Sequence, residues 1–365
     1  AVLPEISDFI GDAPMIAHNI SLDMGFLQQR HGIVKANKGI DTYDLATILL
    51  PGAPRYNLNS LTMQVGIELE NAHRALDDAR AAGLLYWELW KRLLKLPHTI
   101  LQEISAAGSS VQWSTGIVFT AALQQSNTSS RDIVPDDLQG FISAPETYDE
   151  LSPAGKKTAP STQSVAHYLE EDEGFAEKLD AYERRPQQVK MAEKITEAFT
   201  KSKSVMIEAD TGTGKSLAYL IPAVLWAIDH GERVVVSTQT INLQDQLIHQ
   251  DLPTLQKALD LDFRYTVMKG RDHYLCPRQL TAMRRRKPNN PDEVRTLAKI
   301  LVWLTQSQTG DRGEINLRSP AERAIWQRLS ASADNCTVNR CENTMQGICP
   351  FYKACLYSAF LSADY

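Results

Sequence analysis

The chain has 365 residues, which predicts two or three hydrophobic cores and excludes a single small binding module. Hydrophobic residues (43%) and charged residues (22%) are at ordinary globular levels, and no apolar run reaches the roughly 18 residues of a membrane helix. We therefore expect no membrane partner. The net charge of −6 excludes an overall polycation, so any contact with nucleic acid must be made by a local patch.

Residues 1–100 carry the periodicities of an α/β domain. The apolar run Met15–Ala17 predicts a strand, and Leu22, Phe26 and Leu27 have the spacing of the helix that follows it. A second strand-to-helix transition is expected at residues 40–42, and a long amphipathic helix is expected over residues 75–94.

A segment rich in polar residues separates this region from the next. Ser, Thr, Gly, Gln and Pro dominate from about residue 105 to residue 164, a composition typical of a linker. The acidic run Glu170–Glu173 is typical of a solvated helix face. We therefore expect a linker over residues 101–175.

Residues 176–270 alternate between strand and helix patterns, and no internal repeat is visible. Such alternation predicts a parallel sheet with helices on its faces. The expected elements are strands at Val205–Ile207, Val234–Val236 and Tyr265–Met268, and helices at Leu217–Ile228 and Leu243–Leu259.

A glycine loop lies between the first of these strands and the first helix. Residues 209–216 read Ala-Asp-Thr-Gly-Thr-Gly-Lys-Ser. Glycines at positions 212 and 214 let backbone N–H groups approach phosphate oxygens, Lys215 can reach the β- and γ-phosphates, and Ser216 can offer a hydroxyl to Mg²⁺. A chance glycine turn is the alternative, which the flanking strand and helix disfavour. The loop predicts ATP and Mg²⁺ as cofactors.

The loop, with Ala209 at the leading glycine position, resembles the nucleotide loop of superfamily 2 helicases. Residues 237–247 are similar to their motif Ia, and residues 182–191 are similar to their Q motif, which implies that Gln188 reads the adenine edge. The nucleotide-binding residues implied by this resemblance are Tyr182, Arg185, Gln188, Thr211, Gly212, Thr213, Gly214, Lys215 and Ser216.

Five cysteines are unevenly distributed. Cys276 stands alone, whereas Cys336, Cys341, Cys349 and Cys355 fall within one short segment. An odd number of cysteines without a secretory signal favours a reducing cytoplasm over a disulfide scaffold. Four thiolates can hold a structural zinc ion or a [4Fe–4S] cluster, and the spacing does not choose between them. The alternative is that these are merely buried thiols.

The flanking residues Lys269-Gly-Arg-x-x-Tyr-x-Cys-Pro and Cys349-Pro-Phe-Tyr resemble the iron–sulfur insert of XPD- and DinG-type helicases. The resemblance implies an insert over residues 271–365 and a [4Fe–4S] cluster held by Cys276, Cys336, Cys341 and Cys349. Cys355 is then spare, although a Cys349–Cys355 pair remains a rival arrangement. The basic run Arg284–Lys287 predicts either contacts with a DNA backbone or a solvated face.

Two further motifs lie in residues 1–100. His18-Asn-x-x-x-Asp23 and His73-x4-Asp78, with Asp41-Thr42 between them, resemble the second and third motifs of DnaQ-like 3′-5′ exonucleases of the DEDDh type. The resemblance implies that Asp23 and Asp78 hold two divalent cations, Mg²⁺ or Mn²⁺, and that His73 is the general base. Asp77 is expected at the surface. The first motif, Asp-x-Glu, is expected before residue 1.

The complete resemblance predicts an α/β chain in which an RNase H-like exonuclease domain precedes a RecA-like P-loop NTPase domain with a Cys-rich iron–sulfur insert. It implies an ATP-dependent 5′ to 3′ DNA helicase with an attached 3′-5′ exonuclease, acting on single-stranded or forked DNA. An ATP-gated exonuclease without unwinding and a non-enzymatic zinc-stabilised binding module are the alternatives. We expect a fragment that ends before an Asp-Glu-x-His box and hydrolyses little ATP.

Overall fold

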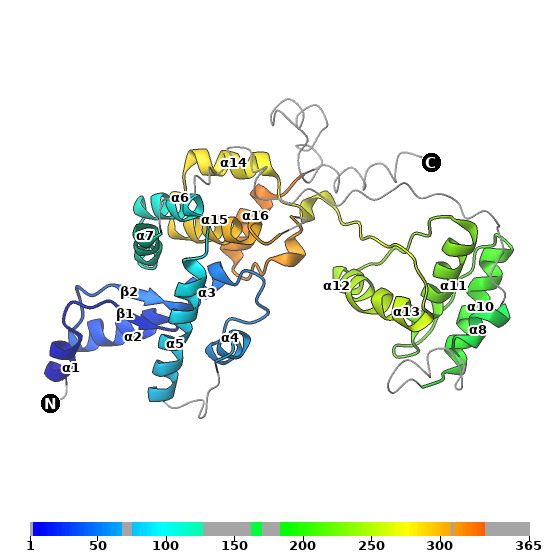
Figure 1. Cartoon of the computed structure of the whole chain (residues 1–365), viewed down its shortest axis with the longest axis horizontal. Helices are drawn as coiled ribbons and strands as arrows, with labels where there is room; N and C mark the ends of the chain where they lie inside the picture. Colours follow the sequence, from blue (N-terminus) through cyan, green and yellow to red (C-terminus); the bar gives the residue numbers. More distant parts are fainter. Residues whose placement is uncertain (1–2, 68–74, 127–161, 170–182, 308–309, 333–365) are drawn as a thin grey trace. The chain divides into compact units, whose positions relative to one another are not determined.

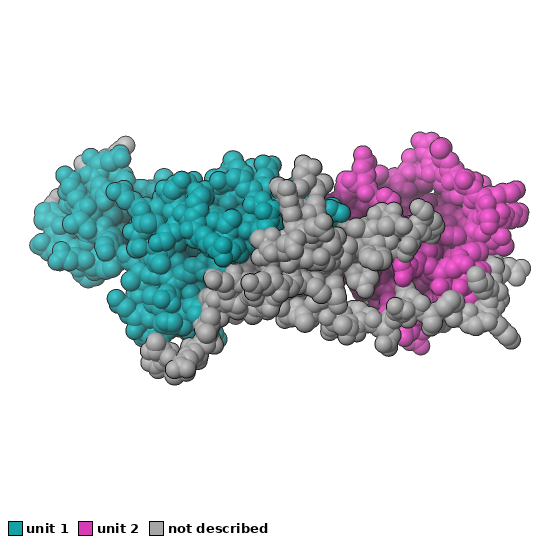
Figure 2. Space-filling view, turned by 90° about the horizontal axis from the view of Figure 1, so that it is seen from above, with its two compact units in different colours: residues 1–146, 269–365 teal, residues 147–268 magenta. Residues whose placement is uncertain are grey.

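The computed structural model describes residues 3–67, 75–126, 162–169, 183–307 and 310–332. This part of the chain is mostly helical (Figure 1), and its sheet consists of two short strands, β1 (Met15–Ala17) and β2 (Gly39–Asp41). The chain divides into two compact units (Figure 2): unit 1 contains residues 1–146 and 269–365, and unit 2 contains residues 147–268. No helix in the described ranges is both long and apolar enough to cross a membrane.

Unit 1 begins with a small α/β arrangement. The strands β1 and β2 run parallel, with Met15 opposite Gly39 and Ala17 opposite Asp41. The expected strand at residues 15–17 and the expected helix over residues 75–94 are confirmed. The helices of this part are α1 (Leu3–Ile10), α2 (Ile20–Gly25) with a π-helical turn (Phe26–Arg30), α3 (Thr42–Leu49), α4 (Leu58–Gln64) and α5 (Ala75–Leu93).

Two packed helices follow where the polar composition predicted the start of a linker. They are α6 (His98–Ser109) and α7 (Gly116–Gln125), and they pack against each other. Apolar side chains recur at helical spacing in this otherwise polar segment, and among them Ile104 and Phe119 are fully buried. The polar composition therefore wrongly predicted a linker where two helices form. Within the rest of the expected linker, the structure describes α8 (Thr162–His167).

Residues 269–332 complete unit 1. Its helices are α14 (Pro277–Arg286), α15 (Pro291–Leu304) and α16 (Pro320–Leu329); one short 3₁₀ turn (Arg271–His273) precedes α14 and another (Arg312–Glu314) lies between α15 and α16. Each helix has proline in its first turn, where the missing N–H costs no hydrogen bond. The helix α15 is buried along nearly its whole length and packs on α3 and α6. One hydrophobic core therefore joins residues from both parts of unit 1.

Unit 2 is built on α10 (Pro186–Thr200), α11 (Lys215–His230), α12 (Ile241–Gln246) and α13 (Leu252–Leu259), with a π-helical turn (Leu247–Asp251) between the last two. Its core contains the apolar faces of α10, α11 and α13. The expected helix at residues 217–228 is confirmed. The expected helix at residues 243–259 is also present, interrupted by the π-helical turn.

The three strands expected in unit 2 are absent from its described residues, and that prediction is wrong for this structure. Segments 205–207, 234–236 and 265–268 are neither strand nor helix, and no backbone hydrogen bond joins them within the described part. Met206 is 98% exposed and Val235 is 81% exposed. The physical reason is that apolar, β-branched residues only favour a strand, whereas a strand forms by pairing with a neighbour.

Candidate functional site

The paired strands β1 and β2 end side by side, and a histidine closes that end. His18 follows β1 and Thr42 follows β2, and the His18 Nδ1 lies 3.0 Å from the Thr42 Oγ1. The His18 Nε2 donates to the backbone carbonyl of Tyr56 at 2.9 Å. Burial lowers the pKa of His18, although the Tyr56 carbonyl and the Asp41 carboxylate act in the opposite direction. The fold therefore favours a neutral imidazole with its proton on Nε2.

Asp41 connects the beginnings of two helices. Its Oδ1 accepts from the backbone N–H of Asn19 and from that of Tyr43, both at 2.9 Å, and the second bond caps α3. Asn19 is the N-cap of α2 and has a left-handed backbone, with φ 66°. Asp41 was expected at a strand-to-helix transition and between the two nuclease motifs, with no role of its own. Its position directly before a predicted helix was the signal that it is a capping residue.

The expected metal ligands Asp23 and Asp78 lie in the first turns of α2 and α5. Asp23 is exposed, Asp78 is half-buried, and α5 packs against β1. No described residue donates a hydrogen bond to either side-chain carboxylate. Carboxylates without partners suit a hard divalent cation. However, the described residues contain no group of three or more His, Cys, Asp or Glu placed to hold a metal ion.

Two neighbouring predictions in this motif have different outcomes. His73, the expected general base, lies outside the described residues. Asp77 was expected at the surface, but the structure places it half-buried like Asp78. The structure thus gives positions for the two carboxylates and for His18, while the complete set of expected nuclease residues is not assembled in the described ranges.

The glycine loop precedes α11 as expected. Gly212 and Gly214 have φ values of 83° and 77°, a backbone conformation that glycine adopts without steric cost. Lys215 begins α11, and its Nζ donates to the carbonyls of Ala209 at 2.8 Å and Asp210 at 3.2 Å. The lysine ammonium therefore bonds to the loop's own carbonyls, and bound phosphate oxygens would compete with these carbonyls for it.

Two residues of the expected Q motif hold this loop. The Arg185 guanidinium donates to the carbonyl of Gly212, and the Gln188 Nε2 donates to the carbonyl of Gly214 at 2.8 Å. Gln188 is buried, and a Cβ built on Gly214 would lie 2.2 Å from its Nε2. The side chain expected to read adenine therefore fixes the loop backbone through its amide nitrogen. Tyr182 lies outside the described residues.

The other expected loop residues are placed around the same turn. Thr213 Oγ1 donates to the Asp210 carbonyl at 2.9 Å, and the Ser216 hydroxyl contacts the side chain of Tyr219. Thr211 is exposed. In the expected motif Ia, Thr240 caps α12 by accepting from the N–H of Leu243 at 3.3 Å.

Cys276, the first expected cluster ligand, is buried at the N-cap of α14 and forms no disulfide. Its backbone N–H donates to the Leu329 carbonyl at 2.8 Å, and the N–H of Ala331 donates to the Tyr274 carbonyl at 2.9 Å. The chain leading toward the later cysteines thus begins beside Cys276. The later cysteines themselves, Cys336, Cys341, Cys349 and Cys355, lie outside the described residues.

The basic run at the end of α14 is partly used inside the fold. Arg284 forms a bidentate ion pair with Glu103 of α6, at 2.7 and 2.8 Å, and both side chains are largely buried. Arg286 donates to Glu293, which also pairs with Arg328. Because Arg284 is committed to Glu103, it fits neither a DNA contact nor a solvated face. Arg285 and Lys287 are exposed.

Comparison with known proteins finds similarity to two families in two parts of the chain. An exonuclease family matches residues 1–86, and the DEAD/DEAH box helicase family matches residues 185–286. The chain is 28% identical over 94% of its length to the 3′-5′ exonuclease DinG of Bacillus subtilis (strain 168), of which it covers 37%. It is 28% identical over 90% of its length to the 3′-5′ exonuclease DinG of Staphylococcus aureus (strain USA300), of which it covers 36%. The chain thus spans little more than a third of these relatives.

Proposed function

We propose that this DinG-type chain combines a 3′-5′ DNA exonuclease with the ATP-binding half of a DNA helicase motor. The observation that carries the proposal is a glycine loop at the N-terminus of α11, bonded by Arg185 and Gln188, on the same chain as the motif that follows β1. Single-stranded or forked DNA is the proposed substrate, and translocation runs 5′ to 3′. The free thiol of Cys276 and the odd number of cysteines support a cytoplasmic location.

The nuclease half supplies carboxylates for phosphodiester hydrolysis. Asp23 and Asp78 would hold Mg²⁺ or Mn²⁺, since both carboxylates lack protein partners among the described residues. Two such ions stabilise the attacking and leaving oxygens of the displacement. His73 would take the proton of the attacking water, a role that suits an imidazole near neutral pH. His18 fixes the approach to α2 and so the place of Asp23.

The ATPase half binds nucleotide through backbone and lysine. The N–H groups of the loop and the positive end of α11 favour the phosphate groups. Lys215 exchanges the carbonyls of Ala209 and Asp210 for phosphate oxygens, and Ser216 would hold Mg²⁺, which neutralises charge on the transferring phosphoryl group. Thr211 and Thr213 offer hydroxyls on the same turn. Gln188 holds Gly214 through its Nε2, and its side-chain oxygen would be the acceptor for the adenine edge.

A [4Fe–4S] cluster held by Cys276, Cys336, Cys341 and Cys349 is part of the proposal. Residues 329–331 bond to residues 274–276, and the five steps from Ala331 to Cys336 span at most about 17 Å. A connection of this length allows Cys336 to join Cys276 in one cluster. Iron and sulfide analysis of anaerobically purified protein tests this part. About four irons, lost in Cys276→Ser and kept in Cys355→Ser, are expected; stoichiometric zinc would overturn it.

A second candidate is an exonuclease whose ATPase half gates access of DNA without unwinding it. Both relatives are named for an exonuclease alone, which favours this candidate. Displacement of a strand from a forked duplex by full-length Asp78→Ala protein separates the two candidates. Because that variant cannot degrade DNA under the proposal, clean ATP-dependent displacement supports a helicase, and its absence with ATP turnover intact supports gating.

A further inference from the structure

The loop between α3 and α4, residues 50–57, is held by a segment more than 250 residues away in the sequence. The N–H of Asn316 donates to the Pro51 carbonyl at 2.8 Å, and its Nδ2 donates to the Ala53 carbonyl at 2.7 Å. Gly52 approaches the segment so closely that a Cβ there would lie 3.1 Å from the Glu314 carbonyl. These contacts fix the backbone of the loop at three successive positions.

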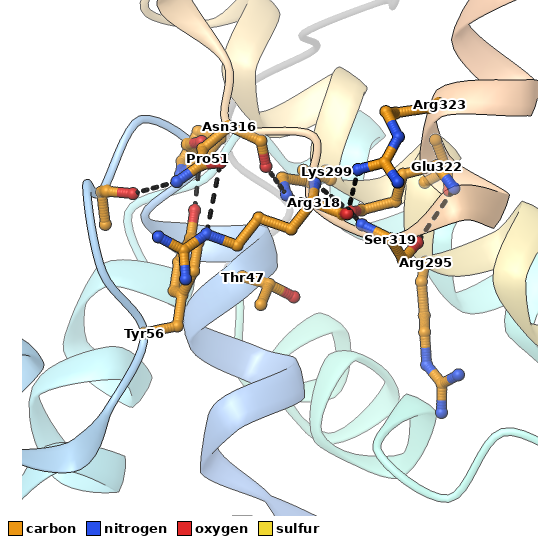
Figure 3. A network of polar contacts seen from close by, with 12 residues as sticks. Thr47, Pro51, Tyr56, Arg295, Lys299, Asn316, Arg318, Ser319, Glu322 and Arg323 are labelled. Carbon is orange, nitrogen blue, oxygen red and sulfur yellow. Dashed lines mark hydrogen bonds and ion pairs between the residues drawn. The ribbon is translucent and has the colours of Figure 1, made fainter.

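Two cations, Lys299 and Arg318, lie over the ring of Tyr56 in this loop. The Lys299 Nζ is 5.5 Å and the Arg318 guanidinium 5.4 Å from the centre of its buried ring, and Figure 3 shows both beside it. Arg318 also donates to the Pro54 carbonyl. The Tyr56 hydroxyl donates to the Leu50 carbonyl at 2.7 Å. The ring is therefore held on its faces and at its hydroxyl.

The holding segment is itself anchored in the core. The buried Lys299 Nζ donates to the Glu322 carboxylate at 2.8 Å and to the Asn316 carbonyl at 2.5 Å. Glu322 also closes a capping box with Ser319 at the start of α16. A buried lysine with two of its three N–H donors bonded to anchored acceptors has little freedom to move.

The loop ends at the nuclease motif. The backbone carbonyl of Tyr56 accepts from the His18 Nε2, and His18 directly precedes Asn19, the N-cap of the helix that carries Asp23. We propose that Asn316 and Arg318 are positioning residues of the nuclease site: they hold the 50–57 loop so that the Tyr56 carbonyl orients His18 and, through it, α2. The inference rests on the proposed nuclease function.

The consequence is that the nuclease unit is discontinuous in sequence. Residues 311–322, which follow the ATPase half along the chain, complete a site whose carboxylates lie in residues 1–100. A loosened loop misplaces Asp23 rather than weakening the binding of DNA. Because small misplacements of a catalytic group cost up to about 100-fold in rate, the effect belongs in kcat, with KM for DNA little changed.

The first experiment needs no nuclease activity. His18 is followed by NMR in full-length protein labelled with ¹³C-histidine, with His18→Gln identifying its signal. Asn316→Ala should move the titration midpoint of His18 upward, toward its ordinary value of 6.5. Burial is the largest cause of the lowered pKa, so the water that a loosened loop admits to the ring outweighs the lost bond to the Tyr56 carbonyl. The matched control is Gln327→Ala, an exposed amide of α16, which should leave the midpoint unchanged. An unchanged midpoint in Asn316→Ala overturns the inference.

The second experiment measures exonuclease kinetics of the same proteins. Asn316→Ala should lower kcat between about 10- and 100-fold at nearly constant KM. Arg318→Lys keeps the cation over Tyr56 but shortens its reach to the Pro54 carbonyl, so a smaller loss is expected; it also serves if Asn316→Ala fails to fold. A shifted His18 midpoint with unchanged kcat overturns the positioning role. If Asp78→Ala retains full nuclease activity, the proposed function fails instead, while the NMR result still decides whether the segment holds His18.

Discussion

Among the described residues, unit 1 has buried ion pairs between distant residues, whereas the ion pairs of unit 2 are exposed and local. In unit 1 the pairs Lys299–Glu322 and Lys269–Asp311 are buried, and each joins residues distant in the sequence. In unit 2 Glu197 pairs with Lys194 and Lys201, three and four residues away on the exposed surface of α10. The first kind of pair specifies which segments meet, whereas the second supports a helix that its own residues already favour.

The two units therefore depend on different interactions for their stability. Unit 1 is held by contacts between segments that lie far apart in the chain, so its stability should depend on single polar side chains. The helices of unit 2 have local support, and its apolar segments 205–207 and 234–236 remain unpaired within the described residues. Substitutions that remove one charge or one glycine test this difference between the units.

The largest effect is expected for Glu322→Gln. Glutamine keeps the capping box of α16 but leaves the Lys299 ammonium buried without its counter-charge, which should cost about 3 to 5 kcal/mol of unfolding free energy. Denaturant unfolding followed by tryptophan fluorescence reports unit 1, since five of the six tryptophans lie there. Adding Lys299→Met should restore part of the loss. Equal stability of Glu322→Gln and the unaltered protein would contradict a buried pair.

A smaller effect is expected in unit 2 for Gly214→Ala. Alanine at φ 77° is strained by about 1 to 2 kcal/mol, and its Cβ would also meet the Gln188 amide at 2.2 Å. Nucleotide affinity, measured by titration, should fall at least about tenfold. Gly212→Ala is the matched control, because its φ is equally positive but its Cβ would meet nothing within 4 Å. Equal losses in both variants would show that Gln188 does not hold the loop.

His18 should give unit 1 a moderate pH dependence. Because burial lowers its pKa in the folded state, the unfolded chain takes up the proton first as pH falls below 6.5, and stability is then lost. His18→Gln should remove this component, so unfolding midpoints measured between pH 7.5 and 5 should decline less steeply. The same slope in both proteins would mean that the imidazole is not held neutral.

The smallest effect is expected for Glu197→Gln on α10. Hydrogen bonds from Lys201 and Lys194 lower the pKa of Glu197 to about 2, but all three side chains are exposed and screened by water. Thermal unfolding of unit 2 at pH 7 should therefore be unchanged. A clear loss of stability would mean that unit 2 also depends on ion pairing.

The same contrast explains what the sequence predicts. The helix over residues 75–94 and the helix at residues 217–228 follow from apolar spacing within one segment. The ion pair of Arg284 with Glu103 joins residues 181 positions apart, and no local pattern indicates it. The strands of unit 2 failed as predictions for the same reason, because a strand requires a partner that periodicity does not name.

In the candidate site too, some residues follow from local sequence patterns and others depend on the folded chain. Motif spacing indicated Lys215, Ser216 and Asp23, and the loop does open α11. The bonds of His18 to Thr42 and Tyr56 depend on the parallel register of β1 with β2 and on the path of the 50–57 loop. Both are properties of the folded chain. The sequence could therefore predict the motif residues but not the residues that hold His18 in place.

We propose that one chain carries two separate chemistries, DNA degradation and ATP turnover. The most direct test follows a 5′-labelled single strand and ATP turnover in full-length protein with Mg²⁺ or Mn²⁺, comparing Asp78→Ala with Lys215→Ala. We expect Asp78→Ala to stop degradation from the 3′ end and to leave DNA-stimulated ATP turnover intact, whereas Lys215→Ala should abolish the turnover and keep the capacity to cleave. Undiminished degradation by Asp78→Ala, or undiminished ATP turnover by Lys215→Ala, would contradict it.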